Sequence, residues 1–481
     1  MNFQTPNIML AGPEIFVFSM ACAILVIDLF LPARWRALCY WLAQLTLIGA
    51  ALLTFKTMTG ASVLTFNHMF VADNLSVLLK LAGYVLTVFV FVYSRDYLQE
   101  RGIFRSEYFV LGLLGLVGTM VMASASHFLT LYLGLELMSL SLYAMIAFQR
   151  DSVVATEAAM KYFVLGAIAS GMLLYGMSML YGATGSLEIA AVARALTKIS
   201  PNDVILIFGL VFVIAGTAFK LGAVPFHMWV PDVYHGAPTA VTLYVGSVPK
   251  LASFALIARL LVGGLEPLAG SWQTMLMILA VLSIAIGNII AIAQDNIKRM
   301  LAYSSISHMG FFLLGILSAS PNGYSASLFY ILVYAVMSLG AFGMIILLSR
   351  SGFEAERLED FKGLNQRSPW HAFLMLLLML SMAGVPPTAG FYAKLLVIQS
   401  IMKVNLIPLA VAAVLLAVIG AYYYLRVIKL MYFDDATERS PIQARWDMRL
   451  LLSFNALLLV GILPWVGTLM EVCRRAIQNL A

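Results

Sequence analysis

Several apolar segments of this chain carry a single ionisable side chain at a depth where a membrane holds no water. Glu136, Lys161, Lys220, Lys250 and Lys394 each interrupt a stretch that is otherwise apolar enough to cross a bilayer. A charge at the bilayer centre costs roughly 2.5–3.5 kcal/mol even on the mildest insertion scale. A chain that keeps several such charges is expected to use them. Buried lysines with one glutamate suit a proton path, because neighbouring charge can switch each group between its protonation states.

The composition places the chain in a membrane. Hydrophobic residues make up 62% of the 481 residues and charged residues only 11%, whereas a soluble domain carries about 25% charged residues. The first apolar segment contains Glu14 and Asp28 and has no basic residue ahead of it, so it does not have the layout of a cleaved signal peptide. We therefore predict an all-α integral membrane protein that retains its first helix.

Charge clusters and turn residues divide the chain into about fourteen spanning helices of membrane length. We place these helices near residues 7–31, 38–58, 73–94, 108–124, 127–148, 153–181, 204–229, 240–262, 272–293, 300–319, 325–349, 371–402, 406–432 and 450–472. They form one polytopic membrane domain (1–481), made of three N-terminal helices (1–105), a first repeat (106–262), a second repeat (272–432) and a C-terminal helix (433–481).

Two of these spans are interrupted by prolines. The seventh runs from Lys220 into Pro225, and the twelfth places Pro386 and Pro387 ahead of Lys394. A proline removes a backbone donor, so a break at membrane depth is tolerated only where protein or water satisfies the freed groups. The breaks are five helices apart. This spacing predicts two inverted five-helix repeats, helices 4–8 and 9–13, with broken helices 7 and 12 and a transport path at the midplane.

Basic residues in the loops predict the orientation, because they concentrate on the cytoplasmic side. With the N-terminus outside, the cytoplasmic loops hold Arg34, Arg36, Arg95, Arg101, Arg105, Arg150, Lys298, Arg299, Arg350, Arg357, Lys362, Arg367, Arg439, Arg445 and Arg449. The opposite side holds only Lys56, Arg194, Lys198, Lys403, Arg474 and Arg475. Both termini are therefore predicted to face the periplasm.

Glu136 and Lys161 lie on consecutive helices, and each has two interpretations. Glu136 could be a structural glutamate that is hydrogen-bonded to Ser139 or to nearby backbone, but its own helix offers no counter-charge. Lys161 lies about two turns into the next helix. It could meet Glu136 across the helix pair, or its side chain could extend to the cytoplasmic surface.

The remaining lysines of the candidate path lie deeper. Lys220 directly precedes the first break and Lys250 follows Pro249 near the middle of the eighth span, so neither reaches the surface easily. Lys394 follows the second break. For each, the alternative is a structural cation, which is a costly use of a charge at this depth.

Other ionisable groups are weaker candidates. His227 and His308 could relay protons, because imidazole titrates near physiological pH, but a single histidine on an apolar helix can also be satisfied by a backbone carbonyl. Lys298 could join the path or be a cytoplasmic anchor. Lys80, Arg259, Arg426 and Lys429 are interpreted as helix-end charges, and Asp232 and Tyr234, just past the first break, as loop caps.

The sequence offers no pattern for a bound cofactor or metal. The three cysteines (Cys22, Cys39 and Cys473) are scattered, and there is no His/Cys cluster, GxGxxG or P-loop. The net charge of +6 does not indicate nucleic acid, because the basic residues lie in loops beside the membrane. We therefore expect no cofactor on this chain, no metal site and no nucleic-acid partner.

Two motifs carry a family resemblance that extends over nearly the whole chain. The segment from Ala218 to Pro238 and the segment from Asp295 to Gly310 resemble the signatures of the antiporter-like membrane subunits of respiratory complex I and of multisubunit cation/proton antiporters. Within this family the chain is most similar to the N type of the bacterial NADH-quinone oxidoreductase. Lys394 stands where antiporter relatives usually have glutamate, no long lateral helix follows the last span, and the opening Pro13-Glu14 is typical of that type.

The resemblance implies a function and a set of site residues. It implies a proton-translocating membrane subunit of NADH:quinone oxidoreductase in a bacterial inner membrane, with the NADH and quinone sites on partner subunits and with subunits K and M as neighbours. It also implies that the proton path consists of these residues: Glu136, Lys161, Lys220, Lys250 and Lys394.

In the expected mechanism, the Glu136 carboxylate holds Lys161 or Lys220 protonated, and the proton then moves through Lys250 towards Lys394. Two alternatives stay open. A sodium/proton antiporter subunit would need clustered carboxylates or carbonyls for sodium, which one mid-membrane glutamate does not provide. A purely structural scaffold would keep pumping when its buried lysines are replaced singly.

Overall fold

The computed structural model describes residues 5–32, 35–201, 203–436, 442, 445–478 and 480. Arg34 and Arg439, which contribute to the predicted loop charge, lie outside these residues. Twelve helices in the described part of the chain are long and apolar enough to cross a membrane, or thirteen if a bent pair near the C-terminal end is one span. The chain is therefore an all-helical membrane protein.

The N-terminal part contains two paired helices, a small hairpin and a long third helix. The elements are η1 (Ile8–Ala11), α1 (Gly12–Phe30), α2 (Ala37–Lys56), β1 (Val63–Thr65), β2 (Phe70–Ala72) and α3 (Asn74–Glu100). The two strands pair antiparallel. Asp73 caps α3, because its carboxylate accepts a hydrogen bond from the backbone N–H of Ser76 (2.8 Å).

The middle of the chain contains the first break. Its elements are α4 (Ser106–Ala123), α5 (Phe128–Ile146), α6 (Val153–Thr184), α7 (Ile189–Leu196), α8 (Val204–Leu221), α9 (Trp229–Gly236), α10 (Thr239–Val245), α11 (Val248–Ile257) and the π-helix η3 (Ala258–Gly264). The seventh span, predicted over 204–229 with a break near Pro225, is helical only as far as Leu221, so the interruption is confirmed but starts earlier than expected. There Gly222 adopts a left-handed conformation (φ 77°) that ends α8.

The last part contains the second break. Its elements are η4 (Glu266–Leu268), α12 (Ala269–Ile292), α13 (Ile297–Leu317), α14 (Pro321–Leu348), η5 (Leu358–Phe361), α15 (Leu364–Arg367), α16 (Pro369–Ala383), α17 (Ala389–Lys403), α18 (Ile407–Phe433), α19 (Trp446–Gly461), η6 (Leu463–Trp465) and α20 (Val466–Ile477). Gly384 (φ 84°) ends α16 as Gly222 ends α8. Five residues of irregular chain, 384–388, separate α16 from α17.

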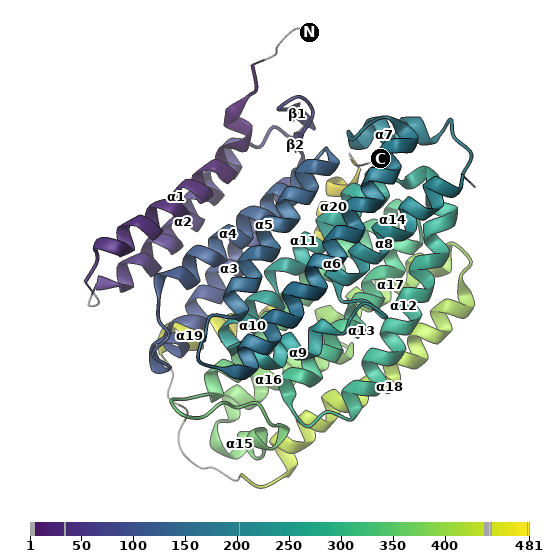
Figure 1. Ribbon diagram of the computed structural model, residues 1–481. Coiled ribbons are helices and arrows are strands. Elements are labelled where there is room, and N and C mark those ends of the chain that lie inside the picture. Colours follow the sequence, from purple (N-terminus) through teal and green to yellow (C-terminus); the bar gives the residue numbers. More distant parts are fainter. Residues whose placement is uncertain are drawn as a thin grey trace.

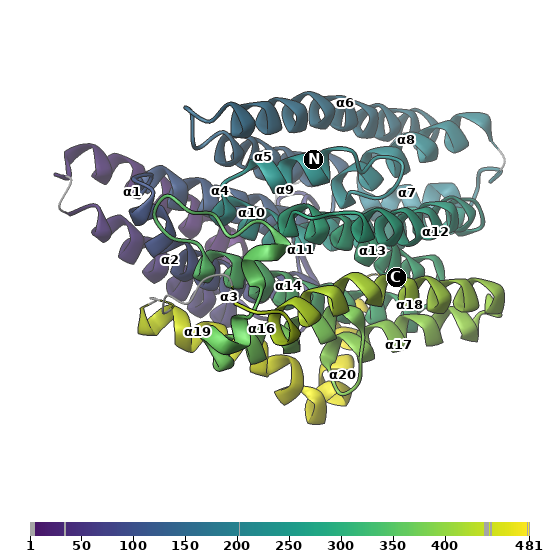
Figure 2. The same ribbon diagram turned by 90° about the horizontal axis from the view of Figure 1, so that it is seen from below.

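The helices differ in how deeply they lie in the bundle. The segments α10–η3, α13 and α14 are buried along nearly their whole length, whereas α6 and α18 leave most of their surface open. Figure 2 shows the same order, with α6 and α8 along one edge, α17 to α20 towards the other, and α11, α13 and α14 between them. The central helices are therefore surrounded by protein, and their polar side chains are shielded from lipid.

Small residues bring neighbouring helices into close contact. A Cβ atom at Gly176 of α6 would lie 2.6 Å from the carbonyl oxygen of Gly209 of α8, and one at Gly216 would lie 2.9 Å from that of Ala169. Only glycine fits at such distances, so α6 and α8 pack backbone to backbone, as small residues allow in membrane helices. This packing fixes the position of α8, which carries Lys220.

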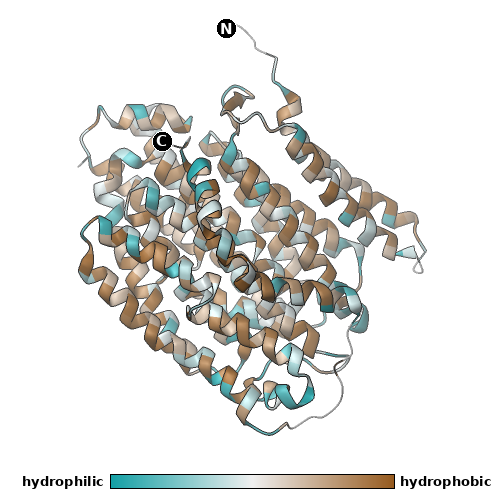
Figure 3. Ribbon diagram, turned by 180° about the vertical axis from the view of Figure 1, so that it is seen from behind, coloured by the Kyte–Doolittle hydropathy of each residue, from teal (hydrophilic) through white to brown (hydrophobic). Residues whose placement is uncertain are grey.

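The two ends of the bundle are distinct. In Figure 1 the start of α1, the end of α20 and the short helix α7 lie at the upper end, and α9 and α15 lie at the lower end. In Figure 3 apolar residues dominate the lengths of the helices, and hydrophilic residues gather towards their ends and in the connections. This distribution fits a bundle that crosses a membrane along its helices.

Candidate functional site

Glu136 and Lys220 approach the same turn of α5 from different helices. Glu136 accepts a hydrogen bond from the Ser170 hydroxyl of α6. One turn further along α5, the hydroxyl of Ser139 accepts a hydrogen bond from Nζ of Lys220 (2.8 Å). Lys220 is 6% exposed. The carboxylate and the ammonium group therefore lie one helical turn apart, with a hydroxyl between them and no ion pair among the described contacts.

Lys250 lies on α11 beside the first break. It is 2% exposed, and its Nζ donates a hydrogen bond to the backbone carbonyl of Leu221 (3.3 Å), the last residue of α8. The C-terminal end of a helix carries partial negative charge on its free carbonyls. The break therefore provides a carbonyl acceptor for the buried Lys250 ammonium group. No carboxylate binds this group among the described contacts.

Lys394 makes a similar contact at the second break. Its Nζ donates hydrogen bonds to the backbone carbonyls of Met382 and Ala383 (both 2.9 Å), at the end of α16. The same ammonium lies 5.1 Å from the centre of the Phe311 ring, a distance that permits a cation–π interaction. Lys220 precedes its break and Lys394 follows its own. Lys250 therefore, rather than Lys220, makes the contact that corresponds to that of Lys394.

His308 lies among tyrosine hydroxyl groups in the core. Its Nδ1 lies 2.7 Å from the hydroxyl of Tyr330, and its Nε2 lies 3.1 Å from that of Tyr424. The ring also packs against Tyr334, with 5.0 Å between the ring centres. Phe311, which contacts Lys394, lies less than one turn further along α13. The structure therefore places His308 between the α14 tyrosines and the second break.

Lys161 is not part of this buried group: of its two interpretations, the structure shows the side chain that extends to the surface and no contact with Glu136 among the described residues. Its side chain is 44% exposed, and its Nζ binds Glu157 and Asp232 (2.8 Å each). Asp232 also binds Arg299 (3.0 Å), so it joins α6, α9 and α13 and is not the loop cap that we expected. Burial would raise the pKa of Asp232, but the hydrogen bonds from Lys161 and Arg299 hold it below its usual value.

His227 and Lys298 lie in different surroundings. His227 is partly exposed in the irregular segment after α8, and no described contact joins its ring to Lys220 or Lys250. Lys298 is 3% exposed, so it is not a surface anchor. Its Nζ donates a hydrogen bond to the backbone carbonyl of Ala237 (2.8 Å), where α9 ends.

Two buried ion pairs were missed. Lys80 of α3 binds Glu14 of α1 (2.5 Å), and Arg259 of η3 binds Asp73 (2.7 and 2.9 Å), so the interpretation of Lys80 and Arg259 as helix-end charges is wrong. Burial would raise the pKa of Asp73, but the Arg259 guanidinium holds it below its usual value. The signal in the sequence was one acidic and one basic residue in separate apolar segments, but the sequence does not indicate which segments meet.

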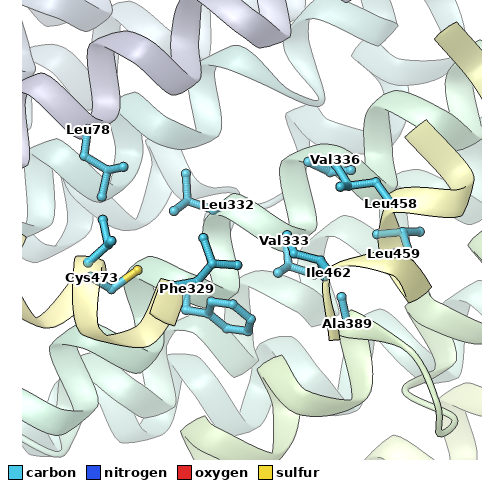
Figure 4. A pocket seen from close by; sticks show the side chains of 12 residues that line it. Leu78, Phe329, Leu332, Val333, Val336, Ala389, Leu458, Leu459, Ile462 and Cys473 are labelled. Atoms are coloured by element: carbon cyan, nitrogen blue, oxygen red, sulfur yellow. The ribbon is translucent and has the colours of Figure 1, made fainter. Parts of the chain in front are cut away.

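One cavity in the membrane region has a wholly apolar lining. It encloses about 110 Å³ between α3, α14, α17, α19 and α20, and its walls include Phe329, Val333, Leu458 and Cys473. Figure 4 shows these side chains around the space, with the Cys473 sulfur as the one heteroatom among the labelled groups. The lining holds no carboxylate, lysine, arginine or histidine, so the cavity is separate from the ionisable residues described above.

Known proteins resemble this chain at two levels. The family model described as NADH:quinone oxidoreductase/Mrp antiporter, TM, matches residues 125–420. NADH-quinone oxidoreductase subunit N of Thioalkalivibrio sulfidiphilus is 62% identical over 99% of this chain and 100% of the relative. The protein of the same name from Thiobacillus denitrificans is 62% identical over 97% of each chain.

Solved structures resemble the fold over nearly its whole length. A chain of respiratory complex I from Thermus thermophilus covers 95% of this chain and 98% of its own length, with 28% identity and a TM-score of 0.82. A chain of the membrane-bound sulfane sulfur reductase, an archaeal respiratory membrane complex, covers 98% and 97%, with 25% identity and a TM-score of 0.87. A chain of the Mrp complex from a Dietzia species is 21% identical (TM-score 0.84), which shows a shared fold.

Proposed function

The chain belongs to the subunit N family of the NADH-quinone oxidoreductases, and we propose that it carries protons along a file of buried and partly buried groups from Glu136 to Lys394. The family is part of a translocase that couples oxidation of NADH by quinone to proton transport, and the chain is a multi-pass membrane subunit of that complex. We assign the NADH and quinone sites to partner subunits, so this chain would carry no cofactor.

One observation carries the proposal. Lys220, Lys250 and Lys394 are bonded to a hydroxyl or to backbone carbonyls, whereas the buried cations Lys80 and Arg259 are each paired with a carboxylate. A lysine with neutral partners can lose its proton without leaving an unpaired buried charge behind. A lysine in a buried ion pair cannot, because the remaining carboxylate would stay charged in a medium of low polarity.

The geometry supports an order of transfer. Ser139 holds the Lys220 ammonium group one helical turn from the Glu136 carboxylate. Loss of the negative charge at Glu136 would therefore destabilise the protonated form of Lys220. Lys250 follows, since it binds the carbonyl of Leu221, the neighbour of Lys220. From Lys250 the proton would pass His308 and reach Lys394. Water in the space opened by the broken helices would bridge these steps.

The finer topology is also a proposal. Counting the broken pair α16–α17 as one span and the bent pair α19–α20 as another gives fourteen spans, and helices 4–8 and 9–13 would then be inverted repeats. The start of α1 and the end of α20 lie at one end of the bundle (Figure 1), which supports two periplasmic termini. Subunits K and M would be the neighbours.

Proton uptake by inverted membrane vesicles tests this function. We expect Lys220→Ala to lower the protons moved per NADH oxidised, at equal amounts of assembled complex. Lys161→Ala is the matched control, because its lysine is exposed and ion-paired, and it should stay near wild type. Equal pumping by both variants would favour a scaffold, and a requirement for sodium in place of protons would favour the antiporter alternative.

A further inference from the structure

A water-accessible hollow lies at the end of the bundle that carries most of the basic loop residues. It has a volume of about 610 Å³ and is bordered by the end of α3, the α9–α10 connection, the start of α13 and the loop after α14. We call this hollow the vestibule. Tyr97, Arg101, Lys298 and Glu354 all line it. Through Lys298 it borders the buried start of α13.

Glu354 is fixed at the wall of the vestibule. Its carboxylate accepts hydrogen bonds from the hydroxyl groups of Tyr97 (3.1 Å) and Thr239, and it forms an ion pair with Arg101. Its side chain is 25% exposed, so water in the vestibule reaches it. The contacts hold it on the α3–α10 side of the opening, beside the residues that surround Lys298.

Lys298 lies at the boundary between the vestibule and the core. It borders the hollow although it is 3% exposed, and its Nζ binds the carbonyl of Ala237. Tyr234, one turn before Ala237 on α9, is fully buried. The ammonium group therefore borders an aqueous space and binds the end of the helix that carries Tyr234.

A series of buried hydroxyl groups continues inward along α13. The hydroxyl oxygens of Tyr234, Ser305 and Ser338 are buried and have no hydrogen-bond partner within the described residues. Ser305 lies near the hydroxyls of both Tyr234 and Tyr334, and Ser338 lies near that of Tyr334. The Tyr334 ring in turn packs against His308. Unpaired buried hydroxyls in such proximity are suited to bridging by water, since each needs a partner.

We propose that protons enter this chain through the vestibule and pass from Lys298 along Tyr234, Ser305 and Tyr334 to His308. This route rests on the proposed function, because it would deliver protons to the file of groups that ends at Lys394. At each step a proton moves onto a neighbouring water, hydroxyl or nitrogen as another leaves, so every group returns to the protonation state in which it started. The hydroxyls of Tyr234 and Ser305 are positioning groups for water and lie outside the lysine file.

The competing interpretation of Lys298 is structural. A cation beside the last carbonyls of α9 stabilises a helix end whether or not it titrates. Arginine would preserve that contact and could not release its proton. Tyr234 and Ser305 have no such structural contact through their hydroxyls, so removal of those hydroxyls separates the two interpretations.

The first experiment removes single hydroxyl groups. Tyr234→Phe and Ser305→Ala in assembled complex should each reduce protons taken up per NADH by inverted vesicles at least as much as Lys298→Arg does. Tyr84→Phe is the matched control, because its buried hydroxyl binds Thr54 far from the route. Wild-type pumping by Tyr234→Phe and Ser305→Ala would overturn the route. If Lys220→Ala also pumped normally, the proposed function would fail as well; if Lys220→Ala lost pumping, only the route would fail.

The second experiment blocks the opening from a defined side. Ser351 is exposed and lines the vestibule. In a Cys22→Ser background, where Cys39 and Cys473 are buried, Ser351→Cys should react with a membrane-impermeant cationic thiosulfonate in inverted vesicles and lose proton uptake upon reaction. Thr197→Cys, at the opposite end, is the control. Full labelling of Ser351→Cys with unchanged uptake would overturn the proposal, as would labelling only from the periplasmic side.

Discussion

Lys250 donates a hydrogen bond to the backbone carbonyl of Leu221, the residue that follows Lys220 (3.3 Å). Lys394 makes the same kind of bond to the carbonyl of Ala383 (2.9 Å) at the end of α16. Each broken helix therefore presents its negative end to a buried ammonium group. The breaks supply neutral acceptors at a depth where a continuous helix would have none to offer.

Replacement of Lys250 separates a titrating lysine from a fixed cation. Alanine removes the proton site, and arginine keeps the charge without releasing a proton, because guanidinium does not titrate in this range. We expect both variants to slow transfer by roughly 10²-fold or more, the size of a lost acid–base step. The measurement is proton uptake per NADH oxidised, normalised to assembled complex. Rescue by arginine would show that Lys250 is a structural cation.

Glu136→Gln preserves the shape of the side chain and its contact with Ser170 while removing the charge near Lys220. We expect an assembled complex with reduced pumping, because the amide no longer favours the protonated lysine. Ser170→Ala keeps the carboxylate and should have a smaller effect. Normal pumping by an assembled Glu136→Gln variant would make the residue structural.

The Glu14–Lys80 pair should behave in the opposite way. Both side chains are buried and bind each other, so Lys80→Met would leave an unpaired carboxylate at a cost of about 3–5 kcal/mol. We expect lower thermal stability of the complex and less assembled subunit. The double variant Glu14→Gln with Lys80→Met should recover much of that loss, and the pumping of whatever assembles should be normal. A pumping defect in the assembled double variant would place this pair in the proton path.

The sequence predicted well what depends on one segment at a time. Apolar length located the membrane helices, and prolines located interruptions near Lys220 and Lys394, because both signals are local. The direction of side chains between helices is not local. The sequence could not decide whether Lys161 meets Glu136 or extends to the surface. The rotation of α6 turns it to the surface, where Asp232 of α9 binds it.

Long-range pairing explains the remaining errors. Arg259 and Asp73 are separated by nearly two hundred residues of sequence, and only the folded arrangement brings them within 2.7 Å. Likewise, the position of Lys298 near the start of a helix is typical of a cytoplasmic anchor. In the fold, the end of α9 covers Lys298, and the Ala237 carbonyl accepts its hydrogen bond. A single sequence carries no signal for such contacts, because each partner is chosen by the packing of other helices.

The orientation can be measured with two cysteines. Thr197 caps the C-terminal end of α7, and Arg357 lies in the connection between α14 and α15. The helices α7 and α15 lie at opposite ends of the bundle (Figure 1). The loop charges predict that Arg357→Cys is labelled from the cytoplasmic side and Thr197→Cys from the periplasmic side. The measurement compares labelling by a membrane-impermeant maleimide in spheroplasts, which expose the periplasmic side, with labelling in inverted vesicles, which expose the cytoplasmic side. Reversed labelling of both would invert the proposed orientation.

Lys394 gives the most stringent test of the proton file, because its contacts with the end of α16 would also suit a purely structural cation. Its ammonium binds two carbonyls of α16 and faces the Phe311 ring, so a structural cation and a proton carrier would occupy the same position. A structural cation at that helix end would tolerate arginine, while a carrier would fail with arginine as with alanine. We expect both Lys394→Ala and Lys394→Arg to pump poorly in assembled complex.

Phe311→Leu provides the matched control for Lys394. It removes the ring contact but leaves both carbonyl bonds and the titrating amine, so pumping should fall far less than in either lysine variant, since such a contact contributes only roughly 0.5–2 kcal/mol. Proton uptake per NADH is compared across the three variants at equal assembly. Pumping by Lys394→Arg at the level of Phe311→Leu would remove Lys394 from the path and end the file at His308.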